Sequence, residues 1–117
     1  MPVILVLEDD SSTRNGLVET LRSLFVGARV ASGRSDAAPG IVTVERADVV
    51  LASMAAVERL YRNGAPEGVA VVALTREMSP ATLMRAEALG VAGALRVPVE
   101  AEQLTAVLGP IIDGLPH

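Results

Sequence analysis

Five short, mostly apolar runs recur along the chain, at residues 3–7, 28–31, 49–52, 69–74 and 92–97. They do not alternate between apolar and polar residues, as a strand with one solvated face would. Runs of this kind are typical of strands that are buried on both faces of a parallel sheet. The pattern therefore predicts five parallel strands.

Two of the intervals between these runs carry clear helix signals. Ser11 is a candidate N-cap, and apolar residues then return at helical spacing until Gly27. Ser79 and Pro80 begin another helix, with a capping hydroxyl followed by proline in the first turn, and Gly90 ends it. We expect a helix over each of these stretches.

Helices are also expected over residues 54–62 and 101–112. Glycine and proline interrupt residues 32–47, where we expect only a short or distorted helix. Strands that alternate with helices over 117 residues indicate a single α/β domain with a doubly wound parallel sheet and right-handed crossovers. In such a sheet the functional groups gather at the carboxyl ends of the strands.

Composition excludes several kinds of chemistry. The chain has no cysteine, so it has no disulfides and no thiolate metal sites. All ten basic residues are arginine, which excludes a lysine Schiff base and a phosphate-binding loop lysine. The net charge of −4 argues against nucleic acid or an anionic membrane as the partner. No run has the length of a membrane span or the form of a signal peptide, so we expect a cytoplasmic protein.

Polar residues stand at the carboxyl ends of three predicted strands. Glu8, Asp9 and Asp10 follow the first strand, Ser53 follows the third, and Thr75 follows the fourth. These are the candidate functional residues of the sheet edge. Acids before a helix are also favoured by the helix dipole alone, so a solvated acidic turn is an alternative to a metal site.

Taken together, these stretches resemble a bacterial response-regulator receiver domain of the chemotaxis-protein (CheY-like) type over the whole chain. The motifs that carry the resemblance are ILVLEDD at 4–10, DVVL at 48–51, LT at 74–75 and LRVP at 95–98. The resemblance implies a flavodoxin-like (βα)5 fold with strand order 2-1-3-4-5 and a site at the switch point of that order.

In active receivers, two acids after the first strand and an aspartate after the third hold Mg²⁺, and that aspartate accepts phosphate from a histidine kinase. A hydroxyl after the fourth strand and a lysine before a cis-proline then bind the phosphoryl oxygens. The resemblance assigns Glu8 and Asp9 to the acidic pair and Thr75 to the hydroxyl. It also implies a cis bond between Val97 and Pro98.

Three positions depart from that pattern. Ser53 stands where the acceptor aspartate belongs, Val97 where the lysine belongs, and Ala94 where an aromatic switch residue is usual. A serine hydroxyl is not ionised at neutral pH, so it cannot attack phosphohistidine without a base. With the third carboxylate missing, Glu8 and Asp9 are left as a weak Mg²⁺ site at most.

Two neighbouring charges do not replace the missing groups. Arg96 precedes Val97, and a one-residue step along a strand turns its side chain to the other face of the sheet. Asp48 precedes the third strand, so it is expected at the opposite edge of the sheet from Ser53 and cannot serve as a displaced acceptor.

We therefore expect a pseudo-receiver: a phosphorylation-independent signalling module of the two-component type, without enzyme activity or a required cofactor, that acts by protein–protein contact. The partner is a signalling protein or a second copy. The resemblance implies that the contact surface is the last helix–strand–helix unit, residues 79–112. The residues chosen on it are Leu83, Glu87, Arg96 and Gln103. A switch driven by phosphorylation of Ser53 or Thr75, or by an anion or metal at the acidic crevice, remains the alternative.

Overall fold

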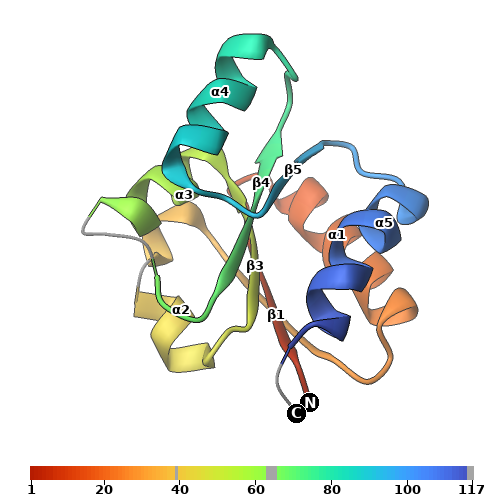
Figure 1. The fold of residues 1–117 in the computed structure, drawn as a ribbon. Helices are drawn as coiled ribbons and strands as arrows, with labels where there is room; N and C mark the ends of the chain where they lie inside the picture. Colours follow the sequence, from red (N-terminus) through yellow and green to blue (C-terminus); the bar gives the residue numbers. More distant parts are fainter. Residues whose placement is uncertain (39, 63–65, 116–117) are drawn as a thin grey trace.

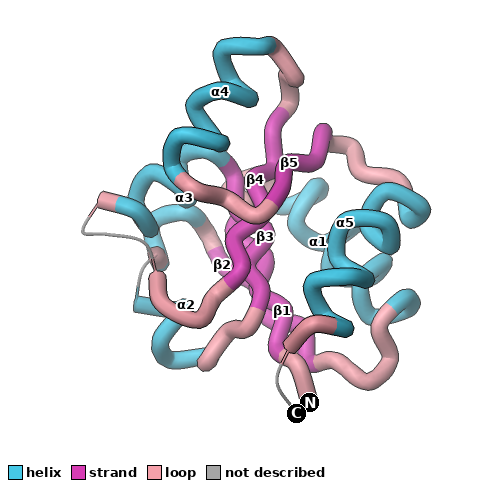
Figure 2. Tube along the Cα trace, viewed as in Figure 1, coloured by secondary structure: helices cyan, strands magenta, loops and turns pink. Residues whose placement is uncertain are grey.

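A five-stranded parallel sheet forms the centre of the protein in a computed structural model that describes residues 1–38, 40–62 and 66–115. The strands are β1 (Val3–Leu7), β2 (Arg29–Gly33), β3 (Val49–Ser53), β4 (Ala70–Thr75) and β5 (Gly93–Arg96). Their order is β2-β1-β3-β4-β5, and all neighbours are parallel. Figure 2 shows the strands at the centre with the helices around them. The predicted fold class and strand order are confirmed.

Helices cover both faces of the sheet (Figure 1). They are α1 (Ser11–Leu24), α2 (Gly40–Glu45), α3 (Met54–Tyr61), α4 (Pro80–Leu89) and α5 (Ala101–Asp113), with a short 3-10 helix η1 (Ser35–Ala37) before α2. Helices α1 and α5 pack on one face, and α2, α3 and α4 lie on the other. Within the described ranges, no helix combines the length and the apolarity that crossing a membrane requires.

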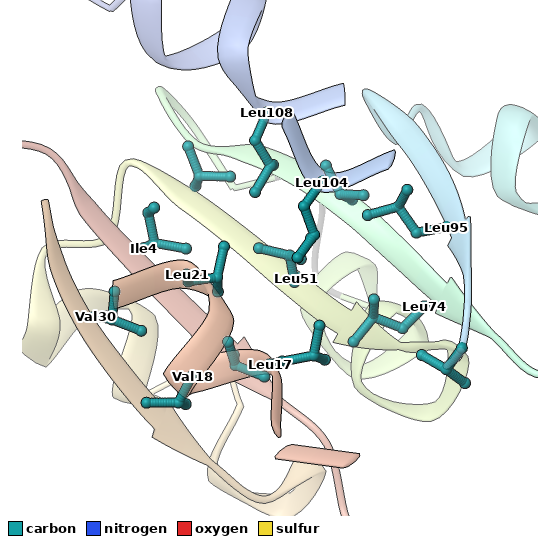
Figure 3. Packing of buried hydrophobic residues seen from close by; sticks show 14 residues of the cluster. Ile4, Leu17, Val18, Leu21, Val30, Leu51, Leu74, Leu95, Leu104 and Leu108 are labelled. Atoms are coloured by element: carbon teal, nitrogen blue, oxygen red, sulfur yellow. The ribbon is translucent and has the colours of Figure 1, made fainter. Parts of the chain in front are cut away.

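The core consists of two aliphatic clusters, one on each face of the sheet. Because successive side chains of a strand point to opposite faces, Val49 and Leu51 join the α1/α5 cluster while Val50 and Ala52 join the other. All four side chains are fully buried. Figure 3 shows the α1/α5 cluster around Leu51. Burial on both faces explains why β3 is apolar along its whole length.

Most predicted elements are confirmed, with small shifts at their ends. The second strand begins at Arg29 and runs to Gly33, two residues beyond its predicted end, and residues 40–45 form the short helix expected after it. Helix α4 is capped by Ser79, whose Oγ accepts from Thr82 N–H at 3.2 Å. It ends at Gly90, whose φ of 91° lies in the left-handed region that favours glycine.

The prediction for the start of the first helix is wrong by one residue. Asp10 is the N-cap of α1, and Ser11 is the first helical residue. The backbone of Asp10 is extended, and its Oδ2 accepts from Thr13 N–H at 2.9 Å. Asp and Ser are both good N-caps, so local pattern alone does not separate two adjacent candidates.

Asp48 lies at the amino edge of the sheet, as predicted. Its Oδ2 accepts from Val3 N–H at 2.8 Å, and its own N–H donates to the carbonyl oxygen of Val3 at 2.9 Å. These contacts join the starts of β1 and β3. Asp48 is therefore far along the strand direction from Ser53, which ends β3.

Candidate functional site

The acidic turn, Glu8 to Asp10, follows β1 at the carboxyl edge of the sheet. Glu8 is only 6% exposed. Its N–H donates to the carbonyl oxygen of Gly33 at 3.1 Å, and its Oε1 accepts from Asp10 N–H at 3.1 Å. A buried carboxylate is costly unless hydrogen bonds and a counter-charge compensate for its lost hydration. The contacts of this turn therefore decide what it can bind.

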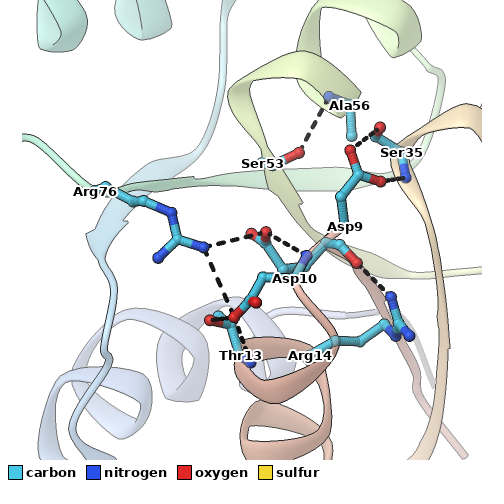
Figure 4. A network of polar contacts seen from close by, with 9 residues as sticks. Asp9, Asp10, Thr13, Arg14, Ser35, Ser53, Ala56 and Arg76 are labelled. Carbon is cyan, nitrogen blue, oxygen red and sulfur yellow. Dashed lines mark hydrogen bonds and ion pairs between the residues drawn. The ribbon is translucent and has the colours of Figure 1, made fainter.

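Asp9 points toward η1 (Figure 4). One carboxylate oxygen accepts from Ser35 N–H at 2.8 Å, and the other accepts from Ser35 Oγ at 2.7 Å. The hydroxyl bond from Ser35, its backbone bond and the charges of Arg34 and Arg14 lower the pKa of Asp9 below its ordinary value. Both oxygens of Asp9 thus have a structural partner in the segment that follows β2.

Asp10 is occupied by the start of α1. Beyond its bond to the Thr13 N–H, its Oδ2 accepts a short hydrogen bond from the Thr13 hydroxyl. These two bonds, together with the charges of Arg76 and Arg14, lower the pKa of Asp10. The three acids of the turn therefore have three separate sets of hydrogen-bond partners.

Two arginines that sequence reasoning did not select contact the acidic turn. Arg76 follows β4, and its Nη2 lies 3.6 Å from Oε1 of Glu8 and 3.9 Å from Oδ2 of Asp10. Arg14 donates from Nη1 to the backbone oxygen of Glu8 at 2.7 Å. Figure 4 shows the guanidinium of Arg76 reaching toward Asp10 from the end of β4. The sequence signal that could have identified Arg76 is its position directly after Thr75, at the same sheet edge.

Ser53 has a structural role that the sequence analysis missed. It is the last residue of β3 and also the N-cap of α3, where its Oγ accepts from Ala56 N–H at 3.4 Å. Thr75 is 4% exposed, and its hydroxyl donates to the sulfur of Met78 at 3.4 Å. Both hydroxyls at the candidate phosphoryl site therefore bond to their own local segments.

The end of β5 is apolar at Val97, which stands where the resemblance would place a phosphate-binding lysine. Val97 is 5% exposed and belongs to the α1/α5 cluster. The Val97–Pro98 bond is cis, as the resemblance implied. Ala94 is half-buried against the cluster on the opposite face, and Arg96 is exposed. Opposite sides for Arg96 and Val97 are what the strand period requires.

The acidic turn does not form a ready metal site. Across residues 1–38, 40–62 and 66–115, no three acidic or histidine side chains are grouped closely enough to hold a metal ion. Mg²⁺ requires several oxygen ligands in near-octahedral geometry. Asp9 faces Ser35 instead, and the charge next to Glu8 and Asp10 is a guanidinium. The arrangement does not fit the ion that the resemblance implied.

A pocket of about 280 Å³ lies on the neighbouring α1 surface. Hydroxyl and small side chains of α1 line one wall, and the segment after β5 lines the other. The lining residues are Ser12, Thr13, Gly16, Leu17, Thr20, Pro98 and Val99. The hydroxyls of Thr13 and Thr20 donate to Asp10 and to the Gly16 carbonyl, so they are already satisfied.

The predicted partner residues are accessible. Leu83 is 40% exposed, and Glu87, Arg96 and Gln103 are also exposed. Helix α4, which contributes Leu83 and Glu87, buries only Ala86 among its ten residues. Arg85 forms an ion pair with Glu58, which joins α4 to α3.

Comparison with solved structures identifies this architecture. The signal receiver domain of a DNA-binding response regulator from Colwellia psychrerythraea 34H matches with a TM-score of 0.85 and 20% identity, over 97% of this chain and 99% of that chain. The chemotaxis protein CheY4 of Vibrio cholerae matches with a TM-score of 0.80 and 22% identity, over 95% and 98%. A putative pilus assembly-related protein from Burkholderia pseudomallei K96243 matches with a TM-score of 0.81 and 24% identity, over 100% and 93%.

No protein-family model matches the chain, and no curated protein does so either. The structural neighbours include receiver domains of response regulators, and their likeness extends over nearly the whole chain. At these identities the likeness establishes the fold and leaves the chemistry to the residues of this chain. The chain has the flavodoxin-like fold of receiver domains, with the strand order that places its acidic turn at the switch point.

Proposed function

We propose that this protein is a signalling module of the receiver type that works without phosphorylation, by binding another protein. The observation that carries the proposal is the state of Ser53. It stands at the end of β3, and its oxygen is the N-cap of α3. A neutral, capping hydroxyl is a poor nucleophile toward a phosphoryl donor.

The residues around Ser53 also support a function that does not depend on phosphorylation. Phosphoryl transfer depends on positioned charges around the transferred group. Val97 contributes only a buried hydrocarbon at the end of β5, and the carboxylate of Asp9 is bonded to Ser35. These side chains therefore supply neither an acceptor for a phosphoryl group nor a positive charge to bind it.

The α4 side of the molecule is the surface through which we propose that the module signals. Leu83 and Met84 are 40% and 69% exposed, and Glu87 lies on the same helix. Single exposed apolar residues are common on folded proteins, so their exposure alone does not indicate a binding surface. The argument for this surface is its place beside β5 and α5, within the unit that the resemblance implies as the contact surface. We propose that a signalling protein binds here, and that the module carries out no catalysis.

Phosphorylation independence is tested by incubating the protein with acetyl phosphate and Mg²⁺ and measuring the intact mass. We expect no added phosphate on the natural chain. Ser53→Asp is the matched variant, because it restores an acceptor carboxylate at the same position. Stable phosphate on the natural chain that disappears in Ser53→Ala would refute the proposal.

Contact is tested by placing a photo-crosslinker at residue 83 and, as a control, at residue 44. Val44 is 79% exposed on α2, away from the proposed surface. We expect one defined crosslinked species from residue 83 in the native cell and none in common with residue 44. Identical products from both positions would count against this surface.

The alternative is a switch driven by a serine/threonine kinase. Thr75 is 4% exposed, so a kinase would have to open the end of β4 to reach it. Ser53 is only half-buried and is the more accessible of the two. Mass spectrometry of the protein from its native cell separates the proposals, because modified Ser53 or Thr75 would favour the kinase.

A further inference from the structure

The thioether of Met78 leads to an inference that goes beyond the proposed function and needs no partner protein. We propose that Met78 is a site of oxidation by hydroperoxides, and that its oxidation state sets the position of the segment that joins β4 to α4. The contact that carries the proposal is the hydrogen bond from the Thr75 hydroxyl to the Met78 sulfur, at 3.4 Å.

The donor of this bond is buried and held in place, whereas the acceptor is accessible. Thr75 is 4% exposed, and its carbonyl oxygen accepts from Val97 N–H at 2.8 Å. Met78 is 37% exposed and lies between β4 and α4, directly before the N-cap Ser79. A small oxidant from solvent therefore reaches the Met78 side chain without opening the sheet.

The reaction requires a hydroperoxide such as hydrogen peroxide as the oxidant. A lone pair of the sulfur attacks one peroxide oxygen, and the S–O bond forms as the O–O bond breaks. The leaving oxygen takes the proton of the transferred oxygen and departs as water, so the sulfur loses two electrons and the peroxide gains them. Because the Thr75 hydroxyl engages one lone pair of the Met78 sulfur, the oxygen is added at the other, which yields one sulfoxide epimer in excess.

The sulfoxide changes the acceptor that is offered to Thr75. Its sulfur carries a partial positive charge and no longer accepts a hydrogen bond, while its oxygen is a stronger acceptor than a thioether. A buried hydroxyl that is left without an acceptor costs more free energy than the bond contributed. Because Val97 holds the backbone of Thr75, the Met78 side chain turns to bring its oxygen to the hydroxyl, and Ser79 shifts with it.

The attachment of α4 allows this shift. Among the ten residues of the helix, Ala86 is buried and Leu89 is partly buried against the sheet. The Oγ of Ser79 accepts from Thr82 N–H at 3.2 Å, so a change at Ser79 acts directly on the first turn. Oxidation of Met78 therefore loosens the first turn of α4 and leaves α5, on the other face of the sheet, unchanged.

A matched pair of full-length variants tests the proposal after the same exposure to hydrogen peroxide. Met84→Leu keeps Met78, whereas Met78→Leu keeps Met84, which is 69% exposed on α4 itself. Leucine preserves the side-chain volume and removes the sulfur. Met1 and Met54 are present in both variants, so their oxidation contributes equally to the two.

The readouts are ¹⁵N amide shifts, amide hydrogen exchange and peptide mass spectrometry. We expect oxidation of Met84→Leu to shift the amides of residues 75–82 and to speed exchange over residues 80–84 about twofold to tenfold, the range for loss of one hydrogen bond. Oxidation of Met78→Leu should do neither. Equal changes in the two variants would overturn the proposal, and so would a natural chain whose Met78 stays reduced once Met84 is fully oxidised.

The sulfoxide epimers give a measurement that exposure alone would not move. Each of the two methionine sulfoxide reductases accepts one epimer, so treatment with each enzyme measures their ratio. We expect an excess of about twofold to tenfold at Met78 of the natural chain. Thr75→Val removes the donor and should bring the ratio close to one. The same ratio in both proteins would contradict the proposal.

Met78→Gln keeps the experiment decisive if peroxide unfolds the chain, because its amide supplies a strong oxygen acceptor without any oxidant. It should shift the amides of residues 75–82, and unshifted amides would overturn the proposal. None of these measurements involves phosphate transfer or a bound protein. Their failure would therefore leave both tests of the proposed function unaffected, and the reverse also holds.

Discussion

Helices α4 and α5 flank the same edge strand but are attached to the protein in different ways. Helix α5 buries Leu104 and Leu108 completely and packs Val107 and Ile111 against the same cluster. Helix α4 buries only Ala86 and exposes Leu83. Burial of large apolar side chains holds α5, whereas α4 is joined to the rest of the protein by the buried Ala86, the partly buried Leu89 and the ion pair of Arg85 with Glu58. The difference predicts that α4 opens locally at a lower free-energy cost than α5.

The largest expected effect comes from removing a buried leucine of α5. Leu104→Ala should lower the free energy of unfolding by about 2–5 kcal/mol, because it creates a cavity in the α1/α5 cluster. Urea unfolding followed by circular dichroism measures the change. The matched variant Leu83→Ala on α4 should change stability by no more than about 0.5 kcal/mol. Similar losses for the two variants would remove the contrast between the helices.

The N-cap of α4 should have a smaller effect. Ser79→Ala removes the bond to Thr82 N–H and should cost about 1 kcal/mol. Amide hydrogen exchange should become faster over residues 80–84 and stay unchanged in α5. Ser11→Ala is the control, since Asp10 and not Ser11 caps α1. A larger effect from Ser11→Ala would show that the caps are assigned wrongly.

The ion pair between α4 and α3 should contribute less again. Arg85→Ala should lower the free energy of unfolding by no more than about 1 kcal/mol, and the loss should shrink as salt is added. A double-mutant cycle with Glu58→Ala isolates the coupling. Coupling that stays constant between low and high salt would contradict an ionic attachment of α4.

The pH dependence of stability tests the contacts of the acidic turn that follows β1. Asp9 and Asp10 have pKa values lowered from 3.8, chiefly by hydrogen bonds from Ser35 and Thr13. A lowered carboxyl pKa stabilises the fold fully above 3.8, and that stabilisation is lost as the pH falls through the folded values. We expect ¹³C carboxyl titrations with midpoints below 3.8. Midpoints at or above it would contradict these contacts.

Pattern and local signals predicted most of the fold. Double-sided burial explains why the strands were found as apolar runs, and Ser79 with Gly90 marked α4 because capping is a local property. The site was less predictable. The partners of Arg76 are set by where β1 and β4 end in space, a tertiary fact that neighbouring residues do not encode. The sequence motifs present Ser53 only as the remnant of an acceptor, and its capping role follows from the helix that begins beside it.

The bond between Asp9 and Ser35 has a consequence for the outer rim of the sheet. Strand β2 is an edge strand, and such strands can recruit strands from other chains when they loosen. Asp9 fastens the residues just beyond its far end, while the ion pair of Arg29 with Glu45 fastens its beginning. We therefore expect the Asp9–Ser35 hydrogen bonds to help keep this edge strand from pairing with strands of other chains.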